Sequence, residues 1–268
     1  MKNTPIVLTI AGSDSGGGAG VQADLKAASA NGVFGASVIT ALTAQNTTAV
    51  TAVHEVPADI VAAQIDAVLS DLDVDAIKLG MLFSAPIIEA TAKRLGAFQG
   101  PVVVDPVMIA KSGDALLQDE AVDALISQIL PHADVLTPNL PEAARLLNTT
   151  EAVTPDDMAA QGQQLLKMGP KTVLMKGGHT TRGLCTDVLV DATGIIATYA
   201  APRINTHNTH GTGCTYAATI ASQLALGLDL ETAVKASHTY LQAAIKAANS
   251  LAIGQGHGPV HHFWNQWT

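Results

Sequence analysis

Cysteine and aromatic side chains are both scarce in this sequence, and each shortage excludes a class of protein. Two cysteines, Cys185 and Cys214, occur in 268 residues. They could form one bridge, but they do not make the disulfide framework of a small secreted domain. Aromatic residues make up 3% of the chain, which is too few for a platform on which nucleic-acid bases stack.

Positive charge is a further shortage. Lys and Arg number 14 against 23 Asp and Glu, which gives a formal net charge of −9. A protein binds the phosphates of a nucleic acid through a basic patch, and none is visible here, so we expect no nucleic-acid partner. An acidic protein can still hold a small anion through backbone amides and a metal ion, and a nucleotide ligand therefore stays open.

Long apolar runs are also absent. No stretch reaches the roughly 18 residues of a membrane span, and the apolar segment after Pro5 is too short for the core of a signal peptide. We therefore expect a cytoplasmic protein with no membrane partner. Hydrophobic residues still make up 48% of the chain, and no linker, repeat or charge block interrupts it. The sequence predicts a single domain over residues 1–268.

Short apolar runs alternate with helical patterns along the chain. Buried strands followed by helices are typical of a mostly parallel sheet with helices on both faces, so the expected fold class is α/β. A turn signal at Asp191–Gly194 predicts a late antiparallel hairpin of Leu184–Val190 and Ile195–Tyr199. The Ala-rich stretch 211–249 predicts two helices broken near Gly227. The other predicted strands lie at 6–10, around 38–39, and at 76–80, 101–105, 134–137 and 172–176, and the other helices end near 30 or lie at 59–69, 85–97 and 119–130.

Polar and glycine-rich residues gather where six of these strands end. Ligands of open α/β sheets bind beyond the carboxyl ends of the strands, so these residues predict one functional rim. The segments are Gly12–Gly20, Thr43–Gln45, Gly80–Met81, Asp105–Pro106, Thr137–Asn139 and Lys176–Gly178.

The glycine-rich segment Gly12–Gly20 permits several interpretations. It fits a permissive dinucleotide-binding pattern, but no acidic residue lies between Asp24 and Glu55 to hold a ribose. It also lacks the Gly-Lys-Ser/Thr of a phosphate-binding P-loop. A flexible turn is the bland alternative. Because glycines allow a close approach of the backbone to a ligand, we favour a wall or lid over a substrate.

A second glycine-rich turn, Gly211-Thr212-Gly213-Cys214, precedes an Ala-rich helix. Backbone amides that converge at a helix N-terminus favour an anion, and they can stabilise a phosphoryl group in transfer. A thiol in this position is expected to have a lowered pKa. Cys214 could instead be a buried helix-cap residue, or a nucleophile paired with His207 or His210, but a nucleophile would leave the rim residues without a role.

Hard oxygen ligands suited to Mg²⁺ follow two of the strands. They are Asp105, with Asn139 and Glu142 in Thr-Pro-Asn-Leu-Pro-Glu. Lys176, which ends another strand, could reach a phosphate as a point charge. Strand-end caps, solvated charges and a helix-start Glu are the alternatives for these residues. The nine histidines lack the spacing of a zinc site.

Long motifs in this order resemble hydroxymethylpyrimidine/phosphomethylpyrimidine kinases of the ribokinase-like superfamily, over nearly the whole chain. The resemblance implies a ribokinase-like sheet, a homodimer, and ATP with Mg²⁺ as co-substrate and cofactor. It also implies two successive phosphorylations of the partner substrate, 4-amino-5-hydroxymethyl-2-methylpyrimidine, in thiamine biosynthesis. The motifs are Ala11–Lys26, Thr40–Thr47, Asp105–Met108 with Lys111–Asp114, Thr137–Asn139, Lys176–His179, His210–Thr215 and Gly256–Pro259.

Site roles follow from the same resemblance. Gln45 would bind the aminopyrimidine, with Gly12, Asp24 and Met81 lining its pocket. Asp105, Asn139, Lys176 and Gly213 would bind ATP, and Asp105 and Glu142 would serve the metal. Gly211, Thr212, Gly213 and Cys214 would form the anion hole, with Lys176 beside it as a further catalytic group.

The resemblance leaves the proton acceptor open, because many sugar kinases of the superfamily have an Asp at the position of Cys214. We hypothesise that Cys214 takes the hydroxyl proton. Two other functions stay open: a pyridoxal or pyridoxine kinase, whose substrates bear the same hydroxymethyl group, and a non-catalytic ligand-binding protein of this fold.

Overall fold

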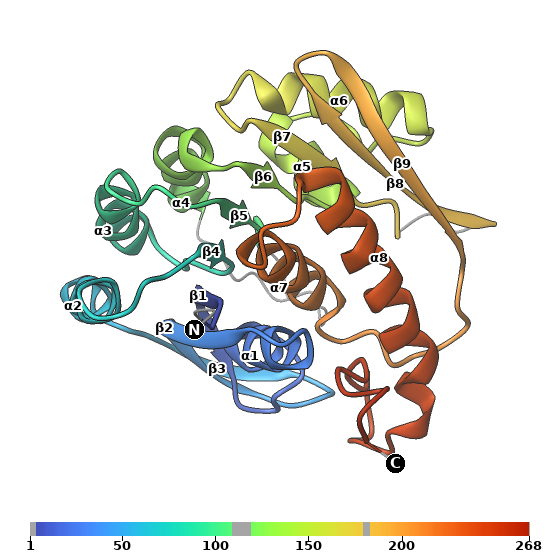
Figure 1. Ribbon diagram of the computed structural model, residues 1–268, viewed down its shortest axis with the longest axis horizontal. Coiled ribbons are helices and arrows are strands. Elements are labelled where there is room, and N and C mark those ends of the chain that lie inside the picture. The colour runs from blue at the N-terminus through green and yellow to red at the C-terminus, as the bar shows by residue number, and fades with distance from the viewer. Residues whose placement is uncertain (1–3, 109–118, 179–182, 268) are drawn as a thin grey trace.

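The computed structural model describes residues 4–108, 119–178 and 183–267. In this part of the chain, nine strands form one sheet in the order β3-β2-β1-β4-β5-β6-β7-β8-β9 (Figure 1). Strands β2, β1, β4, β5, β6 and β7 are parallel, whereas β3, β8 and β9 pair antiparallel. The strands are β1 Ile6–Asp14, β2 Phe34–Gln45, β3 Val50–Glu55, β4 Ala76–Leu79, β5 Val102–Val104, β6 Val135–Leu136, β7 Thr172–Met175, β8 Leu184–Asp191 and β9 Gly194–Pro202.

Helices cover both faces of the sheet, and each face has its own apolar core. Buried side chains of α2 to α6 pack against one face, and those of α1, α7 and α8 pack against the other (Figure 1). Strands β4 and β5 lie between the two layers and are buried along their whole length. The helices are α1 Gly20–Ala30, α2 Ala58–Leu69, α3 Ala85–Leu95, α4 Asp119–Ala124, α5 Leu140–Leu147, α6 Pro155–Leu166, α7 Thr212–Ala225 and α8 Leu230–Ala247.

The chain reverses its direction of travel across the sheet at β1. It goes from β1 to β2 on one side, and β4 then pairs with the opposite side of β1. A crevice forms outside the carboxyl ends of strands at such a switch point. The fold therefore places the end of β1, with its glycine-rich loop, beside the residues that follow β4.

The structure confirms the α/β class, the mostly parallel sheet, the late hairpin β8–β9 and the break near Gly227. It adds one strand and two helices that the pattern did not predict: β3, α5 and α6. Both helices begin with a capping box, Asn139 with Glu142 and Thr154 with Asp157, which was a readable signal. The helix predicted at 119–130 becomes α4 followed by a π turn and a 3₁₀ turn.

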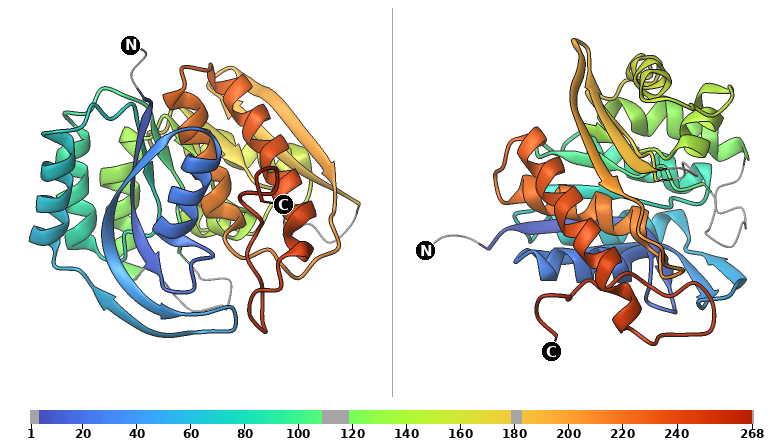
Figure 2. Two further views of the ribbon diagram at one scale, coloured as in Figure 1. Left: turned by 60° about the horizontal axis from the view of Figure 1, so that its bottom comes forward. Right: turned by 90° about the vertical axis from the view of Figure 1, so that its right-hand side faces the viewer.

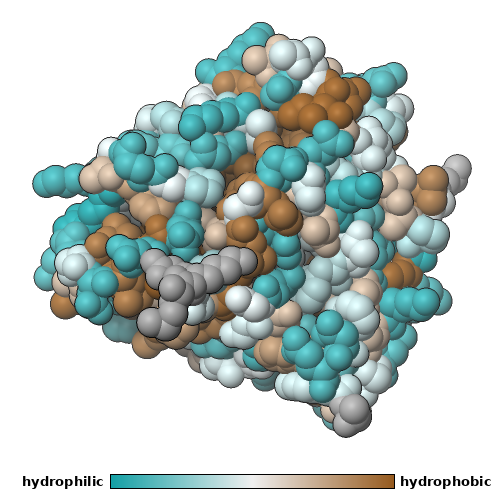
Figure 3. Space-filling view, in the orientation of Figure 1, coloured by the Kyte–Doolittle hydropathy of each residue, from teal (hydrophilic) through white to brown (hydrophobic). Residues whose placement is uncertain are grey.

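The segment after α8 returns along the side of the molecule (Figure 2). The amide of His210 donates to the carbonyl of Gly258 at 3.0 Å, and the amide of His257 donates to the carbonyl of Thr47 at 2.8 Å. The C-terminal segment thus ties the second glycine-rich turn to the end of β2. Hydrophilic residues cover much of the face seen in Figure 3, with hydrophobic side chains in scattered groups. Among the described residues, no helix is long and apolar enough to cross a membrane.

Candidate active site

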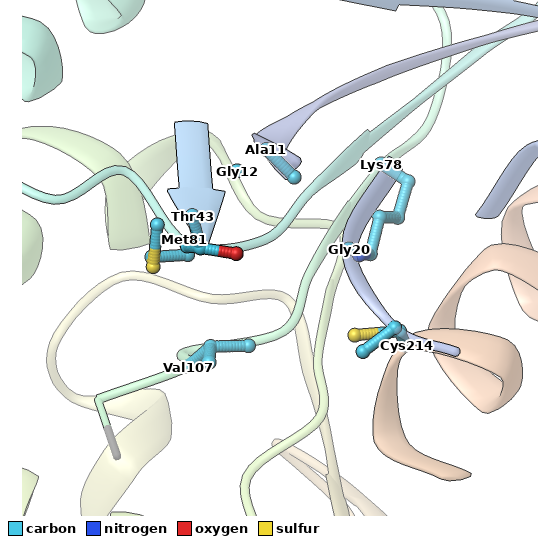
Figure 4. A pocket seen from close by; sticks show the side chains of 9 residues that line it. Ala11, Gly12, Gly20, Thr43, Lys78, Met81, Val107 and Cys214 are labelled. Carbon is cyan, nitrogen blue, oxygen red and sulfur yellow. The ribbon is translucent and has the colours of Figure 1, made fainter. Parts of the chain in front are cut away.

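A pocket lies at the switch point between β1 and β4 (Figure 4). Its cavity volume is about 60 Å³, and the pocket is partly open to solvent. Its lining comes from the ends of β1, β2 and β4, from the glycine-rich loop and from the start of α7. The lining residues are Ala11, Gly12, Ala19, Gly20, Thr43, Lys78, Met81, Val107 and Cys214.

The glycine-rich loop is organised by the carboxylate of Asp14, at the end of β1. This carboxylate accepts hydrogen bonds from the amides of Gly16, Gly18 and Ala19, at 2.8, 3.0 and 2.8 Å. Nε2 of His210 lies 2.8 Å from Asp14 Oδ2. Burial alone would raise the pKa of Asp14, but these hydrogen bonds hold the pKa below its ordinary value. The loop is therefore a pre-formed wall of the pocket, fastened to the second glycine-rich turn.

The second turn leads directly into α7, as the sequence predicted. Gly211 is the N-cap and has a φ of 77°, a left-handed conformation that suits glycine. A Cβ on Gly211 would lie 1.8 Å from the carbonyl oxygen of Gly18, so the two glycine-rich segments touch through their backbones. Among the described residues, the amides of Gly213 and Cys214 donate to no backbone carbonyl. They remain available to an anion at the positive end of α7.

Asp105 and Lys176 lie next to this helix terminus. Nζ of Lys176 donates to Asp105 Oδ1 at 2.7 Å, and both side chains are largely buried. A Cβ on Gly213 would lie 3.4 Å from Asp105 Oδ2 and 3.5 Å from Lys176 Nζ. Burial opposes the charge of Lys176, but Asp105 and Glu142 raise its pKa above the ordinary value. The structure thus brings together Asp105 and Lys176, which follow two of the six strands whose ends were predicted to form one rim.

Glu142 faces the same cluster from the first turn of α5. Its Oε2 accepts from the amide of Asn139 at 2.8 Å, and Oδ1 of Asn139 accepts from the amide of Glu142 at 2.8 Å. Burial raises the pKa of Glu142 to about 7, with Lys176 opposing the shift and Asp105 adding to it. Its carboxylate is thus ionised only in part near neutral pH. The sequence left two roles open for Glu142, a residue that starts a helix and a metal ligand. The two roles are compatible, because the same side chain caps α5 and faces Asp105.

Gln45 ends β2 at the margin of the pocket. Its Oε1 lies 3.0 Å from the hydroxyl of Thr43, which lines the pocket, and its Nε2 lies 3.4 Å from Nε2 of His210. Gln45 itself lines a smaller neighbouring hollow with His210 and His257. Gly12 and Met81 line the main pocket as expected, and a Cβ on Gly12 would lie 2.4 Å from Cε of Met81.

One expectation about Cys214 is wrong. Burial raises the pKa of its thiol to about 11, although Lys78 and the Gly20 backbone oppose the shift. Desolvation of a thiolate outweighs the positive helix end, which was the only effect that the sequence displayed. At neutral pH the side chain is a thiol. Cys185 and Cys214 are both free, which excludes the disulfide between them in this structure.

Asp24 occupies a different place from the expected one. It lies behind the pocket lining, where its carboxylate pairs with Nζ of Lys78 at 2.8 and 3.0 Å. Lys78, not Asp24, reaches the pocket. Sequence reasoning missed Lys78 as a site residue, although a lysine inside the apolar strand Ala76–Leu79 was a visible signal.

His210 contacts Asp14 and lies near Gln45, and these are its side-chain partners among the described residues. His210 therefore does not form the histidine–cysteine pair of a thiol nucleophile. His262 lies on the other side of the turn, with Nε2 2.9 Å from the hydroxyl of Thr215, and burial lowers its pKa to about 3. Two motif segments, Lys111–Asp114 and His179, lie outside the described residues.

The sequence is similar to proteins whose activity is named. Residues 14–261 match the sequence model of a family described as phosphomethylpyrimidine kinase. A hydroxymethylpyrimidine/phosphomethylpyrimidine kinase of Rhizobium meliloti is 55% identical over 264 residues, which cover 98% of this chain and 99% of the relative.

Two solved structures show the same fold. A phosphomethylpyrimidine kinase from Clostridium difficile is 44% identical with a TM-score of 0.78, over 90% of this chain and 99% of that one. An ADP complex of Bacillus subtilis pyridoxal kinase is 35% identical with a TM-score of 0.90, over 99% and 100% of the two chains. The family model matches residues 14–261, and the Rhizobium meliloti relative is 55% identical over 98% of this chain, so the chain belongs to the phosphomethylpyrimidine kinase family.

Proposed function

We propose that this protein transfers the γ-phosphoryl group of ATP to the hydroxymethyl oxygen of 4-amino-5-hydroxymethyl-2-methylpyrimidine. A second transfer to the monophosphate gives the diphosphate used in thiamine biosynthesis. The observation that carries the proposal is the position of the α7 N-terminus, between the Asp105–Lys176 pair and the pocket that Cys214 lines. The α7 N-terminus can therefore hold the migrating phosphoryl group, with the acceptor oxygen on the pocket side and the nucleotide phosphates on the Asp105–Lys176 side.

The nucleotide side is formed by Asp105, Asn139, Glu142 and Lys176. In phosphoryl transfer the protein positions the reactants and neutralises charge on the migrating group. Lys176 supplies a fixed cation, and the amides of Gly213 and Cys214 supply donors that cost no reorganisation during the reaction. ADP is present in the Bacillus subtilis pyridoxal kinase complex of the same fold, which supports a nucleotide site here.

Magnesium fits the same cluster. Mg²⁺ takes one or two carboxylates together with phosphate oxygens and water. Asp105 and Glu142 offer two carboxylates close to the Lys176 ammonium, since both raise the pKa of Lys176. The ion would neutralise charge on the nucleotide phosphates, while these residues hold and orient it.

The aminopyrimidine side is formed by Gln45, Gly12 and Met81. The side-chain amide of Gln45 offers both a donor and an acceptor, which match a ring nitrogen and an exocyclic amine. Met81 is held by the hydroxyl of Thr40, which donates to its carbonyl at 2.6 Å. Because Gly12 has no side chain, Met81 packs directly against the β1 backbone at that point and forms part of the pocket wall.

The proton of the acceptor hydroxyl poses a constraint. A thiol with a pKa of about 11 is rarely ionised at neutral pH, so Cys214 can act as a base only where a nearby charge favours its thiolate. The loose transition state of phosphoryl transfer places little demand on early proton removal. We therefore assign Cys214 contact with the acceptor oxygen, and we assign charge stabilisation to the surrounding cations and amides.

Sequence identity supports the pyrimidine substrate over pyridoxal. The two pyrimidine kinases are 55% and 44% identical to this chain, whereas the pyridoxal kinase is 35% identical. The deciding experiment is a ³¹P NMR time course with Mg·ATP and either the aminopyrimidine or pyridoxal. The proposal expects the pyrimidine monophosphate first and the diphosphate after it. Faster phosphorylation of pyridoxal would show that pyridoxal, and not the aminopyrimidine, is the preferred substrate. No transfer to either compound would support a non-catalytic binding protein.

A further inference from the structure

Lys78 is a fully buried cation in the middle of the sheet. Its strand, β4, pairs with β1 on one side and with β5 on the other, and the residue has 0% exposure. Its neighbours along the strand, Ile77 and Leu79, are buried as well. Removing an ammonium group from water is costly unless a partner and hydrogen bonds compensate it.

The compensation comes from Asp24 on α1. Both carboxylate oxygens of Asp24 accept from Lys78 Nζ, and the hydroxyl of Thr9 donates to Asp24 Oδ2 at 2.6 Å. Burial opposes the charge of Lys78, but Asp24 raises its pKa above the ordinary value, so the ammonium form is kept. Stability is a weak reason for such a pair, since apolar residues of similar volume often serve a core as well or better.

The position of the ammonium group points to the phosphoryl-transfer site. Lys78 lines the same pocket as Cys214, and the two residues flank Gly20 in Figure 4. A Cβ on Gly80 would lie 2.8 Å from Lys78 Nζ, so the glycine after the strand leaves room for the charged group. An ammonium has three N–H donors, and Asp24 offers two oxygens. One donor remains for the pocket side.

The charges around Cys214 agree with this geometry. Lys78 lowers the pKa of the Cys214 thiol, while burial, Asp24 and Asp105 raise it. In return, Cys214 raises the pKa of Lys78. Among the cations of the described residues, Lys78 thus has the largest lowering effect on the pKa of the Cys214 thiol.

We propose that Lys78 is an electrostatic positioning residue, whose buried positive charge, oriented by Asp24, stabilises negative charge at Cys214 and at the acceptor oxygen during transfer. Asp24 acts through Lys78 and does not touch the substrate. This inference rests on the proposed function, and it explains why an ion pair is kept at a place where apolar side chains would serve the core.

A double variant separates an electrostatic role from a structural one. Lys78→Met/Asp24→Asn replaces the ion pair by groups of similar size, and the amide introduced on α1 carries no charge and can still accept from the Thr9 hydroxyl. A structural role predicts that the double variant folds and works like the parent. The electrostatic role predicts that it folds, that kcat falls at least tenfold, and that KM for Mg·ATP changes by less than threefold.

Alkylation of Cys214 provides a readout that does not depend on turnover. All proteins carry Cys185→Ser, so that iodoacetamide at pH 8 reports on Cys214 alone. The double variant removes the lowering effect of Lys78 on the Cys214 pKa and the smaller raising effect of Asp24. Alkylation should therefore slow by about twofold or more, because less thiolate is present. Lys171→Met is the matched control: Lys171 is an exposed lysine that also pairs with an aspartate, Asp134, at 2.6 Å. It should alter neither alkylation nor kcat.

The outcomes are distinguishable. Normal alkylation together with normal kcat in the folded double variant would overturn the inference. If that variant fails to fold, Lys78→Met alone replaces it, because burial already raises the pKa of Asp24 and favours its neutral form once the lysine is gone. If the parent phosphorylates neither test compound, the proposed function fails, while the alkylation rates still decide whether Lys78 acts on Cys214.

Discussion

Substitution of Gly211 tests the contact between the two glycine-rich segments. In Gly211→Ala, the new Cβ would lie 1.8 Å from the carbonyl oxygen of Gly18. A separation of about 3.0 Å is the closest that such atoms tolerate, so the segments must move apart by about 1.2 Å (3.0 minus 1.8). Misplacement by ~1 Å at a reacting centre can cost ~10²-fold in rate. We expect kcat to fall by about this factor.

Backbone strain must be separated from displacement, because Gly211 also has a φ of 77°. An alanine in the left-handed region costs ~1–2 kcal/mol whatever its surroundings. Gly227, just beyond the other end of α7, provides the control: its φ is 86° and nothing lies within 4 Å of a Cβ there. Gly227→Ala should lose ~1–2 kcal/mol of unfolding free energy and keep its activity.

The assay combines urea unfolding with steady-state kinetics on both variants. Gly211→Ala should be destabilised by at least as much as Gly227→Ala, and only Gly211→Ala should lose turnover. If Gly211→Ala folds and retains kcat within twofold of the parent, the turn does not need its present position against Gly18. The assigned anion site would then be refuted.

Three further predictions concern individual side chains of the site. Glu142 has a pKa raised to about 7, so its carboxylate goes from roughly one-tenth ionised at pH 6 to nine-tenths at pH 8. KM for Mg·ATP should therefore fall about tenfold from pH 6 to pH 8. In Glu142→Gln this fall should be absent, and the same variant controls for the titration of ATP itself. Cys214→Ala should lose ~10²-fold in kcat with little change in KM for ATP, because the acceptor oxygen loses the contact that positions it, and near-normal turnover would remove Cys214 from the reaction. Gln45→Glu should lose about tenfold or more in kcat/KM for the aminopyrimidine, because a carboxylate donates no hydrogen bond; an equal loss for ATP would contradict its assignment to the pyrimidine side.

The sequence carried enough information for the sheet and for the rim of the site. Strand ends such as Asp105 and Lys176 are separated by 71 positions, yet parallel strands bring their carboxyl ends to one edge. The late hairpin was readable from Asp191–Gly194, because its turn residues mark the reversal. β3 was not predicted, since its exposed edge position leaves no buried apolar pattern.

Electrostatic environment was the part that local sequence did not reveal. The sequence shows that Cys214 precedes a helix, but it does not show how far neighbouring segments remove the thiol from water. The pairing of Asp24 with Lys78 joins residues 54 positions apart, through the packing of α1 on the sheet. The homodimer and the Mg²⁺ ion stay predictions.

The central claim is that the amides at the start of α7 bind the phosphoryl group in transit. The direct measurement is an amide NMR spectrum of the protein with Mg·ADP, fluoroaluminate and the aminopyrimidine, compared with Mg·ADP alone. Fluoroaluminate stands in for the migrating phosphoryl group. The account predicts that the amide protons of Gly213 and Cys214 move downfield only in the full complex. Unchanged resonances for both amides, in a complex that perturbs Gln45 and Lys176, would contradict it.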